Sequence, residues 1–202
     1  MFKHLEKIRS FALVGATGLV GQEFLEILAE NRIKFGKLRL LASEESAGDY
    51  LEVGELSGQV EVLGPNSFEG IEVAFFSVPV DITRKFVPKA VEAGCLVVDD
   101  SSAYRMIPDV PLLVPQVNPH RLVDFRGKVI ATPNCTVTPL AVSLKPLQDN
   151  FGLERVVVST YQSVSGAGKR AYDELAHQTA SLLNGGNEEP DVFPHPIAFN
   201  CL

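Results

Sequence analysis

The sequence is poor in cysteine, in clustered positive charge and in long apolar runs. Its 202 residues include three cysteines at irregular spacing, so neither a disulfide framework nor a zinc site is indicated. Lysine and arginine total 18 against 25 aspartates and glutamates, which gives a net charge of −7. This balance argues against nucleic acid or an anionic membrane as a general partner, because both require clustered basic residues. A small anionic substrate needs only one or two arginines and stays compatible with the sequence.

No segment is long and apolar enough to suggest a membrane span. The longest apolar stretch, Val73–Val80, is interrupted by Ser77 and Pro79 and is far shorter than the roughly 20 residues that a spanning helix needs. The start, Met1–Lys7, lacks the apolar core of a signal peptide. Neither an internal repeat nor a low-complexity tract is visible. We therefore expect a soluble, cytoplasmic protein.

Short apolar runs alternate with helical patterns through the first two thirds of the chain. Continuous apolar runs suit strands that are buried on both faces of a parallel sheet. The alternation predicts a βαβ arrangement and therefore a Rossmann-like, doubly wound parallel sheet. The expected strands are Phe11–Gly15, Lys37–Ala42, Val73–Ser77, Cys95–Asp99 and Gly127–Thr132, and the expected helices are Leu19–Glu30 and Thr83–Ala93.

The last third of the chain offers fewer elements. We place a domain boundary near Pro133, with residues 1–132 in the first domain and residues 133–202 in the second. The second domain is expected to hold a helix from about Thr136, a strand at Arg155–Thr160 and a helix over Lys169–Leu183, followed by a proline-rich tail. One strand and two helices cover their own apolar faces poorly, so this α+β domain is expected to be incomplete.

A glycine-rich loop lies between the first expected strand and the first expected helix. Gly15, Gly18 and Gly21 follow a Gly-x-x-Gly-x-x-Gly spacing. Such glycines permit a tight turn and a close backbone approach, and the following helix offers free N–H groups to a pyrophosphate. Glycines at a strand-to-helix turn can also be purely structural. The strand-loop-helix context favours a dinucleotide site.

Acidic residues follow the second expected strand and bear on the choice of dinucleotide. Glu44 and Glu45 lie in the stretch Ser43–Asp49. An acidic residue at this place commonly binds the ribose 2′-hydroxyl of NAD and repels the 2′-phosphate of NADP. Both glutamates could equally be solvated loop charges.

Cys135 lies directly after one expected strand and directly before an expected helix. A lone cysteine is usually a small buried hydrophobe, an interpretation that suits Cys95 and extends with less support to Cys201. At Cys135 the helix N-terminus offers free N–H groups and the positive end of the helix dipole, which favour the nucleophilic thiolate. Pro139 in the first turn supports the helix start. We therefore expect Cys135 to be the nucleophile.

Taken together, six ordered motifs make the sequence similar to the aspartate-semialdehyde dehydrogenase family over essentially its whole length. The motifs are Gly15–Gly21, Ser43–Gly48, Asp100–Met106, Val114–Pro119, Pro133–Thr136 and Tyr161–Gly168. Each motif alone is a weak signal, whereas six in order are specific. The resemblance implies NADPH-dependent reduction of L-aspartyl 4-phosphate to aspartate 4-semialdehyde, on the route to lysine, methionine and threonine. It also implies a homo-oligomer, expected to be a homodimer, whose catalytic and dimerisation domain begins at residue 133.

The resemblance assigns roles to individual residues. Cys135 would carry an acyl thioester, Gln162 would hold and orient the substrate, Arg105 would bind its phosphate, and Asn134 would assist the nucleophile. The residues expected at the cofactor are Gly15, Thr17, Gly18, Leu19, Val20, Gly21, Ser43, Glu45, Ser46, Ser165 and Gly166. Because NADP-dependent members usually carry a basic residue where Glu45 stands, NAD use also stays open.

The histidines of the chain do not match the general-base motif of the family. His4, His120, His177 and His195 all lie outside it, and His177 is expected on the surface of a helix. We therefore expect the chain to be the front part of a longer enzyme and to turn over poorly on its own. Two alternatives are a non-catalytic nucleotide-binding module and N-acetyl-γ-glutamyl-phosphate reductase. The reductase would be expected to show Gly-Cys-Tyr, where this chain has Asn134-Cys135-Thr136.

Overall fold

The structure is a computed structural model that describes residues 8–202. Met1–Lys7 and His4 therefore lie outside the described residues, and so does the expectation about a signal peptide. The chain divides into two compact units, Met1–Val157 and Val158–Leu202. The domain boundary expected near Pro133 stays a prediction.

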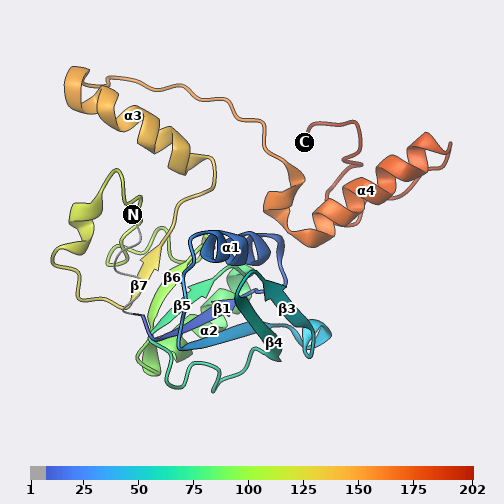
Figure 1. The fold of residues 1–202 in the computed structure, drawn as a ribbon. Helices are drawn as coiled ribbons and strands as arrows, with labels where there is room; N and C mark the ends of the chain where they lie inside the picture. The colour runs from blue at the N-terminus through green and yellow to red at the C-terminus, as the bar shows by residue number, and fades with distance from the viewer. Residues whose placement is uncertain (1–7) are drawn as a thin grey trace. The chain divides into compact units, whose positions relative to one another are not determined.

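A seven-stranded sheet forms the centre of the first unit (Figure 1). Its strands are β1 (Ser10–Val14), β2 (Lys37–Ala42), β3 (Tyr50–Val53), β4 (Leu56–Val62), β5 (Val73–Phe76), β6 (Leu96–Asp99) and β7 (Val129–Ala131). The strand order is β3-β4-β2-β1-β5-β6-β7, and every pair is parallel except β3–β4. The chain thus runs outward from β1 in one direction and from β5 in the other. This confirms the Rossmann-like, doubly wound sheet.

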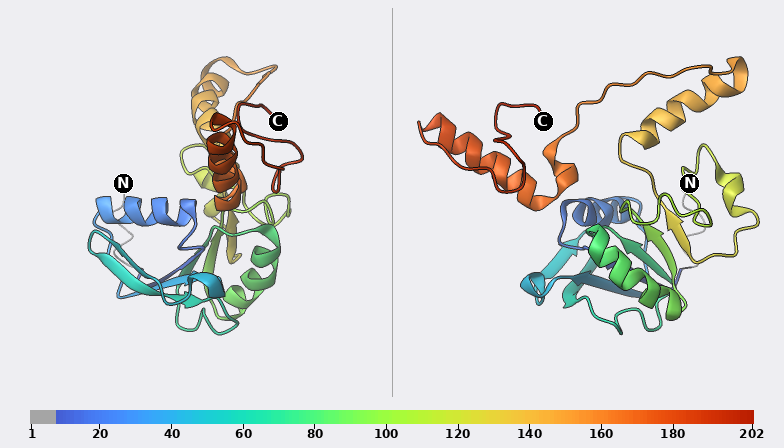
Figure 2. Two further views of the ribbon diagram at one scale, coloured as in Figure 1. Left: turned by 90° about the vertical axis from the view of Figure 1, so that its right-hand side faces the viewer. Right: turned by 180° about the vertical axis from the view of Figure 1, so that it is seen from behind.

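Helices α1 (Leu19–Glu30) and α2 (Val80–Glu92) cover opposite faces of the sheet (Figure 2). Successive side chains of a strand point to opposite faces, so β1 contributes to both cores. Phe11 and Leu13 join the hydrophobic cluster that contains Leu25 and Leu28 of α1. Their neighbours Ala12 and Val14 join the cluster that contains Phe86 and Val87 of α2. All five residues of β1 are buried, and four of them, Phe11–Val14, belong to the predicted apolar run.

The hairpin of β3 and β4 is absent from the sequence expectations. The two strands are antiparallel, and Gly54 with Glu55 connects them. Gly54 adopts a φ of 60°, which glycine tolerates in a tight hairpin turn. Exposed residues alternate with half-buried residues along β3 and with buried or half-buried residues over the first five positions of β4, and Tyr50 is 65% exposed. Such alternation is a strand signal that the search for continuous apolar runs misses.

The strand expected at Arg155–Thr160 is wrong. These residues form no strand, and none of the strands in residues 8–202 pairs with them. Val156, Val157 and Val158 are 46%, 76% and 48% exposed. A high β-propensity favours an extended backbone, but a strand also needs a partner for its N–H and C=O groups. The sequence shows only the first of these two conditions.

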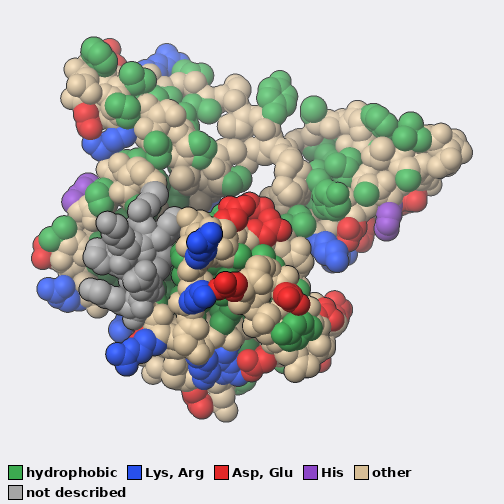
Figure 3. Space-filling view, viewed as in Figure 1, with side chains coloured by type: hydrophobic (Ala, Val, Ile, Leu, Met, Phe, Trp, Pro, Cys, Tyr) green, Lys and Arg blue, Asp and Glu red, His purple; other side chains and the backbone are tan. Residues whose placement is uncertain are grey.

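The helix expected near Thr136 is α3 (Val137–Phe151), and it belongs to the first unit. None of its residues is buried. Figure 3 shows hydrophobic side chains on the surface of this part of the molecule. Val142 and Leu147 of α3 are 39% and 45% exposed. Short 3₁₀ turns also occur in this unit, namely η2 (Glu44–Ser46) and η3 (Pro119–Leu122).

The second unit consists of η4 (Val164–Ala167), α4 (Lys169–Leu183) and a tail that folds back along α4. Gln178 on α4 is buried, and its side-chain oxygen accepts hydrogen bonds from the backbone N–H groups of Ile197 and Ala198. These bonds tie the proline-rich tail to the helix. Among the helices within residues 8–202, none has both the length and the apolar character needed to cross a membrane.

Candidate active site

The candidate site of the first unit lies along one edge of the sheet. Parallel strands place their carboxyl ends at the same edge, and ligands of doubly wound sheets bind outside that edge where the strand order reverses. Here the reversal falls between β1 and β5. The residues that follow the strands at this edge are Gly15 after β1, Ser43 after β2, Ser77 after β5, Asp100 after β6 and Thr132 after β7. The glycine loop, Arg105 and Cys135 all follow these strand ends.

The glycine loop is tightly fixed at the reversal point. The N–H of Gly15 donates to the carbonyl oxygen of Leu41 at 2.8 Å, and the N–H of Gly18 donates to that of Gly15 at 3.0 Å. Gly15 has a φ of 92°, and a β-carbon there would lie 2.2 Å from the carbonyl oxygen of Ser77. Only glycine therefore fits at this position.

The start of α1 suits a pyrophosphate. Gly18 is the N-cap residue and makes no side-chain capping bond, and the first turn carries no acidic residue. Helix N-termini offer unsatisfied N–H groups and a positive dipole end to an anion. The expected cofactor residues Leu19 and Val20 begin this helix and are exposed. The local chemistry thus fits the phosphates of a dinucleotide.

A hydrogen bond joins the glycine loop to the loop after β2. The hydroxyl of Thr17 donates to the hydroxyl oxygen of Ser46 at 3.2 Å. Ser46 ends η2, which begins directly after Ser43 and contains the exposed Glu45. The structure therefore brings together two groups of expected cofactor residues that lie 29 positions apart in the sequence.

Cys135 stands between β7 and α3, and its thiol is exposed. Asn134 organises this turn, because its side-chain oxygen accepts hydrogen bonds from the N–H and the hydroxyl of Thr136 at 3.1 and 2.7 Å. The same oxygen lies 3.8 Å from the sulfur of Cys135 and accepts its weak S–H bond. Asn134 and the nucleophile candidate are therefore in direct contact just before the first turn of α3.

Arg105 is anchored by the backbone of two strand ends. Its Nε donates to the carbonyl oxygen of Thr132 at 2.9 Å, and its Nη2 donates to the carbonyl oxygen of Asp100 at 2.8 Å. The side chain of Thr132 donates in turn to the carboxylate of Asp100. Arg105 is half-buried and lies at the same sheet edge as the start of the Cys135 segment.

Asp99 is a buried carboxyl group that the sequence analysis did not single out. It ends β6, is fully buried, and accepts hydrogen bonds from the N–H and the hydroxyl of Ser101, both at 3.0 Å. Burial raises the pKa of Asp99 above its ordinary value of 3.8, and the bonds from Ser101 oppose this rise. An aspartate that directly continues an apolar strand is the sequence signal for such a group.

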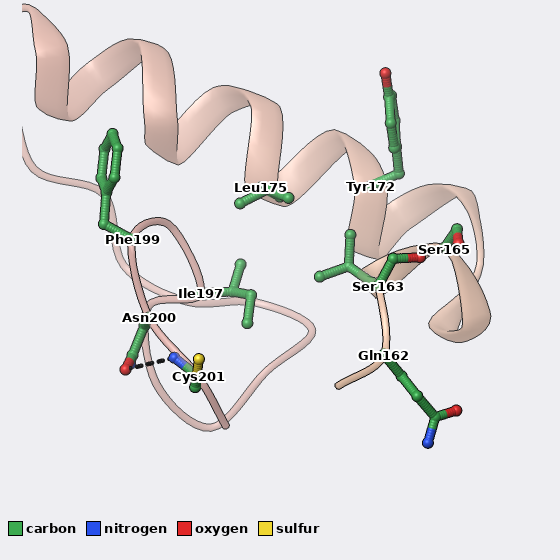
Figure 4. A pocket seen from close by; sticks show the side chains of 10 residues that line it. Gln162, Ser163, Ser165, Tyr172, Leu175, Ile197, Phe199, Asn200 and Cys201 are labelled. Atoms are coloured by element: carbon green, nitrogen blue, oxygen red, sulfur yellow. Dashed lines mark hydrogen bonds between the residues drawn. The ribbon is translucent and has the colours of Figure 1, made fainter. Parts of the chain in front are cut away.

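Gln162, Ser165 and Gly166 belong to the second unit. Gln162 is exposed, and its Nε2 donates to the hydroxyl of Thr160 at 3.2 Å. Gln162 and Ser165 line a pocket of about 660 Å³ together with residues of α4 and the tail (Figure 4). Gly166 lies in η4 beside Ser165. Gln162 belongs to the second unit, whereas Cys135 belongs to the first.

The other cysteines and histidines differ in exposure. Cys95 is fully buried and its thiol donates to the carbonyl oxygen of Ile71 at 3.0 Å, which agrees with the expected structural role. Cys201 is exposed, so a buried role for it is wrong. Cys201 lines the same pocket as Gln162 and Leu175. His120, His177 and His195 are all exposed.

Comparison with known proteins links both units to one family. The model of the semialdehyde dehydrogenase NAD-binding domain matches residues 10–125, and that of the semialdehyde dehydrogenase dimerisation domain matches residues 144–202. The aspartate-semialdehyde dehydrogenase of Rickettsia conorii is 46% identical over 199 residues, which cover 98% of this chain and 59% of the relative. The chain thus spans less than two thirds of that relative's length.

Solved structures agree in sequence and fold. Aspartate semialdehyde dehydrogenase II from Vibrio cholerae, complexed with ASA, is 43% identical with a TM-score of 0.88, over 96% of this chain and 58% of that structure. The Candida albicans enzyme with NADP is 29% identical with a TM-score of 0.58, over 72% of this chain and 48% of that structure. Since the NAD-binding family model alone matches more than half of the residues, the chain belongs to the semialdehyde dehydrogenase family.

Proposed function

We propose that the protein carrying this chain is an aspartate-semialdehyde dehydrogenase that reduces L-aspartyl 4-phosphate through a thioester on Cys135. The observation that carries the proposal is the exposed Cys135 thiol, in contact with Asn134 and placed immediately before α3. Its support is the family membership together with relatives of that name at about 45% identity. Because the chain spans 59% of the first relative, the activity is proposed for the whole protein.

Gly15–Gly21 is proposed to hold the pyrophosphate of the dinucleotide. The N-terminal N–H groups of α1 would bind the phosphate oxygens, and Thr17 and Ser46 would line the adenosine side. The bound nicotinamide supplies hydride, the two-electron reductant of the reaction. The complex of the Candida albicans relative with NADP favours NADPH as the cofactor, whereas Glu45 leaves room for NADH. We further propose that the assembly is a homodimer, as the family name of the second domain suggests.

Cys135 is proposed to attack the acyl carbon of the substrate as a thiolate. The new carbon–sulfur bond replaces the bond to the phosphate oxygen, and inorganic phosphate leaves with that bonding pair. Arg105 would bind the phosphate group, because a guanidinium carries its charge permanently and matches phosphate oxygens in pairs. Hydride addition to the thioester carbon then expels the thiolate and gives the aldehyde. Gln162 would orient the amino-acid part of the substrate.

Two other functions make different predictions. N-acetyl-γ-glutamyl-phosphate reductase would use the same thioester chemistry on a longer, acetylated substrate. A non-catalytic nucleotide-binding module would bind the dinucleotide without turnover. The sequence Asn134-Cys135-Thr136 and the names of the relatives favour the aspartate enzyme.

The reaction can be tested in the oxidative direction with the purified natural protein. We expect phosphate-dependent formation of NADPH from aspartate semialdehyde and NADP, and no formation from N-acetylglutamate semialdehyde. Cys135→Ser should lose this activity and still bind NADPH as tightly as the unchanged protein. Cys201→Ser is the matched control, because it removes the other exposed thiol. Turnover that persists in Cys135→Ser would overturn the mechanism, and a preference for the acetylated aldehyde would overturn the substrate.

A further inference from the structure

Three hydrogen bonds link Arg105, Asp100 and Thr132 to one another in a closed arrangement, and Thr132 is the residue that follows β7. Arg105 donates to the carbonyl oxygens of Thr132 and Asp100 at 2.9 and 2.8 Å. The hydroxyl of Thr132 donates to the carboxylate of Asp100, which links the same two residues to each other. The backbone closes the arrangement as well, because the N–H of Thr132 donates to the carbonyl oxygen of Asp99 at 2.9 Å.

The two hydrogen bonds that Arg105 donates use one edge of its guanidinium group. Arginine carries five N–H donors in a planar fork. Nε and the neighbouring N–H of Nη2 form one edge, and both donate to backbone carbonyls. Within residues 8–202, Nη1 of Arg105 makes no hydrogen bond with the protein. The Nη1 and Nη2 end of the fork is therefore available for bidentate binding of a phosphate.

We propose that Thr132 and Asp100 are positioning residues that aim this end of Arg105 at the phosphate of the substrate. The inference rests on the proposed function, in which Arg105 binds that phosphate. The two carbonyl oxygens hold the guanidinium plane, and the hydroxyl-to-carboxylate bond holds the two carbonyls relative to each other. Thr132 also stands three residues before Cys135, so the same bond ties the phosphate-binding arginine to the segment of the nucleophile.

The test measures the KM for phosphate in the oxidative direction, using the purified natural protein. Thr132→Val keeps the shape of the side chain and removes the hydroxyl. We expect the phosphate KM to rise about tenfold, roughly the effect of one hydrogen bond. The KM for the aldehyde should stay within about twofold of that of the unchanged protein, because the lost bond does not contact the aldehyde. Thr132→Ser, which keeps the hydroxyl, should have the phosphate KM of the unchanged protein. A lower melting temperature of Thr132→Val without a selective rise of the phosphate KM would show that Thr132 only stabilises the fold, and would overturn the positioning role.

Arg105→Lys separates a failure of this inference from a failure of the proposed function. An unchanged phosphate KM in Arg105→Lys would show that Arg105 does not bind phosphate, and both proposals about it would be overturned. A raised KM in Arg105→Lys with an unchanged KM in Thr132→Val would overturn only the positioning role. In the double variant, we expect no further rise beyond that of Arg105→Lys, because both changes act on one group. Additive effects would contradict the inference.

Asp100→Ala provides a second approach to the same bond. It removes the acceptor of the Thr132 hydroxyl and leaves Thr132 in place, so it should also raise the phosphate KM selectively. It serves if Thr132→Val does not fold. If neither variant folds, the bond is structural and the positioning role is overturned. A readout without turnover is phosphate protection of Cys135 from iodoacetamide, which should weaken in both variants and persist in Thr132→Ser.

Discussion

A β-carbon added at Gly21 would lie 2.1 Å from the carbonyl oxygen of Gly15. The atom in the way belongs to the backbone of the glycine loop, so no side-chain rotation can relieve the contact. Gly21 is also buried in the first turn of α1. The close approach of helix and loop therefore depends on the absence of a side chain at this position.

Gly21→Ala should lower the free energy of unfolding by roughly 1–3 kcal/mol, the usual effect of overpacking. This loss should exceed the gain of up to about 1 kcal/mol that alanine brings to a helix. Gly18→Ala is the matched control, because its β-carbon would lie 3.3 Å from the same oxygen and its φ is −73°. It should fold well and weaken NADPH binding. Urea unfolding and cofactor titration of both variants check the prediction, and equal stability of the two would contradict it.

Cys135 should be the first thiol to react with iodoacetamide at neutral pH. Its sulfur is exposed, whereas burial raises the pKa of the Cys95 thiol above its ordinary value of 9.0. Cys201 is the informative comparison because it is also exposed but does not precede a helix. Peptide mapping over time measures the order of labelling. Faster labelling of Cys201 would show that the start of α3 does not activate Cys135.

The sequence predicted the sheet well because its central strands are buried on both faces. The buried end of a strand such as β2 (Lys37–Ala42) must then be continuously apolar, as Leu40–Ala42 is. Such an apolar run can be recognised in the sequence without knowing which strands pair with it. The β3–β4 hairpin is half-exposed, so it carries an alternating pattern and was missed. The strand predicted at Arg155–Thr160 is wrong for a different reason. The composition of this segment suits a strand, but a strand also needs a second segment to pair with, and composition does not show one.

The candidate site also has a part that the sequence predicts and a part that it does not. Residues at strand ends and helix starts, such as Gly15 and Cys135, are visible in the sequence because the element boundaries mark them. The hydrogen bond between Thr17 and Ser46 joins two loops, and the bond between Thr132 and Asp100 joins two strand ends. Such pairings depend on the strand order, which no local pattern specifies.

Glu45→Arg should tighten the binding of NADPH and leave that of NADH nearly unchanged. Glu45 lies in η2 next to Ser46, whose hydroxyl contacts Thr17 of the glycine loop. A 2′-phosphate near position 45 would meet a cation in place of a like charge. Hydrogen bonds to charged groups contribute roughly 1.5–3 kcal/mol, so an improvement of about tenfold or more is expected. Glu44→Arg is the control for a general charge effect. Equal changes for both cofactors in fluorescence titrations would show that residue 45 does not face the ribose.

Asp99 should make the stability of the first unit depend on pH in a defined direction. Burial raises the pKa of its carboxyl group in the folded protein, while the unfolded chain titrates near 3.8. Between these two values the folded state binds more protons than the unfolded state. The contribution of Asp99 to stability is therefore fully present below pH ~4, and it is lost as the pH rises through the folded pKa.

Asp99→Asn removes this titration and keeps one oxygen that can accept a hydrogen bond from Ser101. The stability of the unchanged protein minus that of the variant should thus be largest near pH 4 and should decline to a plateau as the pH rises. Urea unfolding of both proteins at a series of pH values measures this difference. Asp109→Asn, at an exposed position, controls for the loss of a carboxyl group elsewhere in the unit. A difference that stays constant with pH, or grows with it, would show that burial does not govern the ionisation of Asp99.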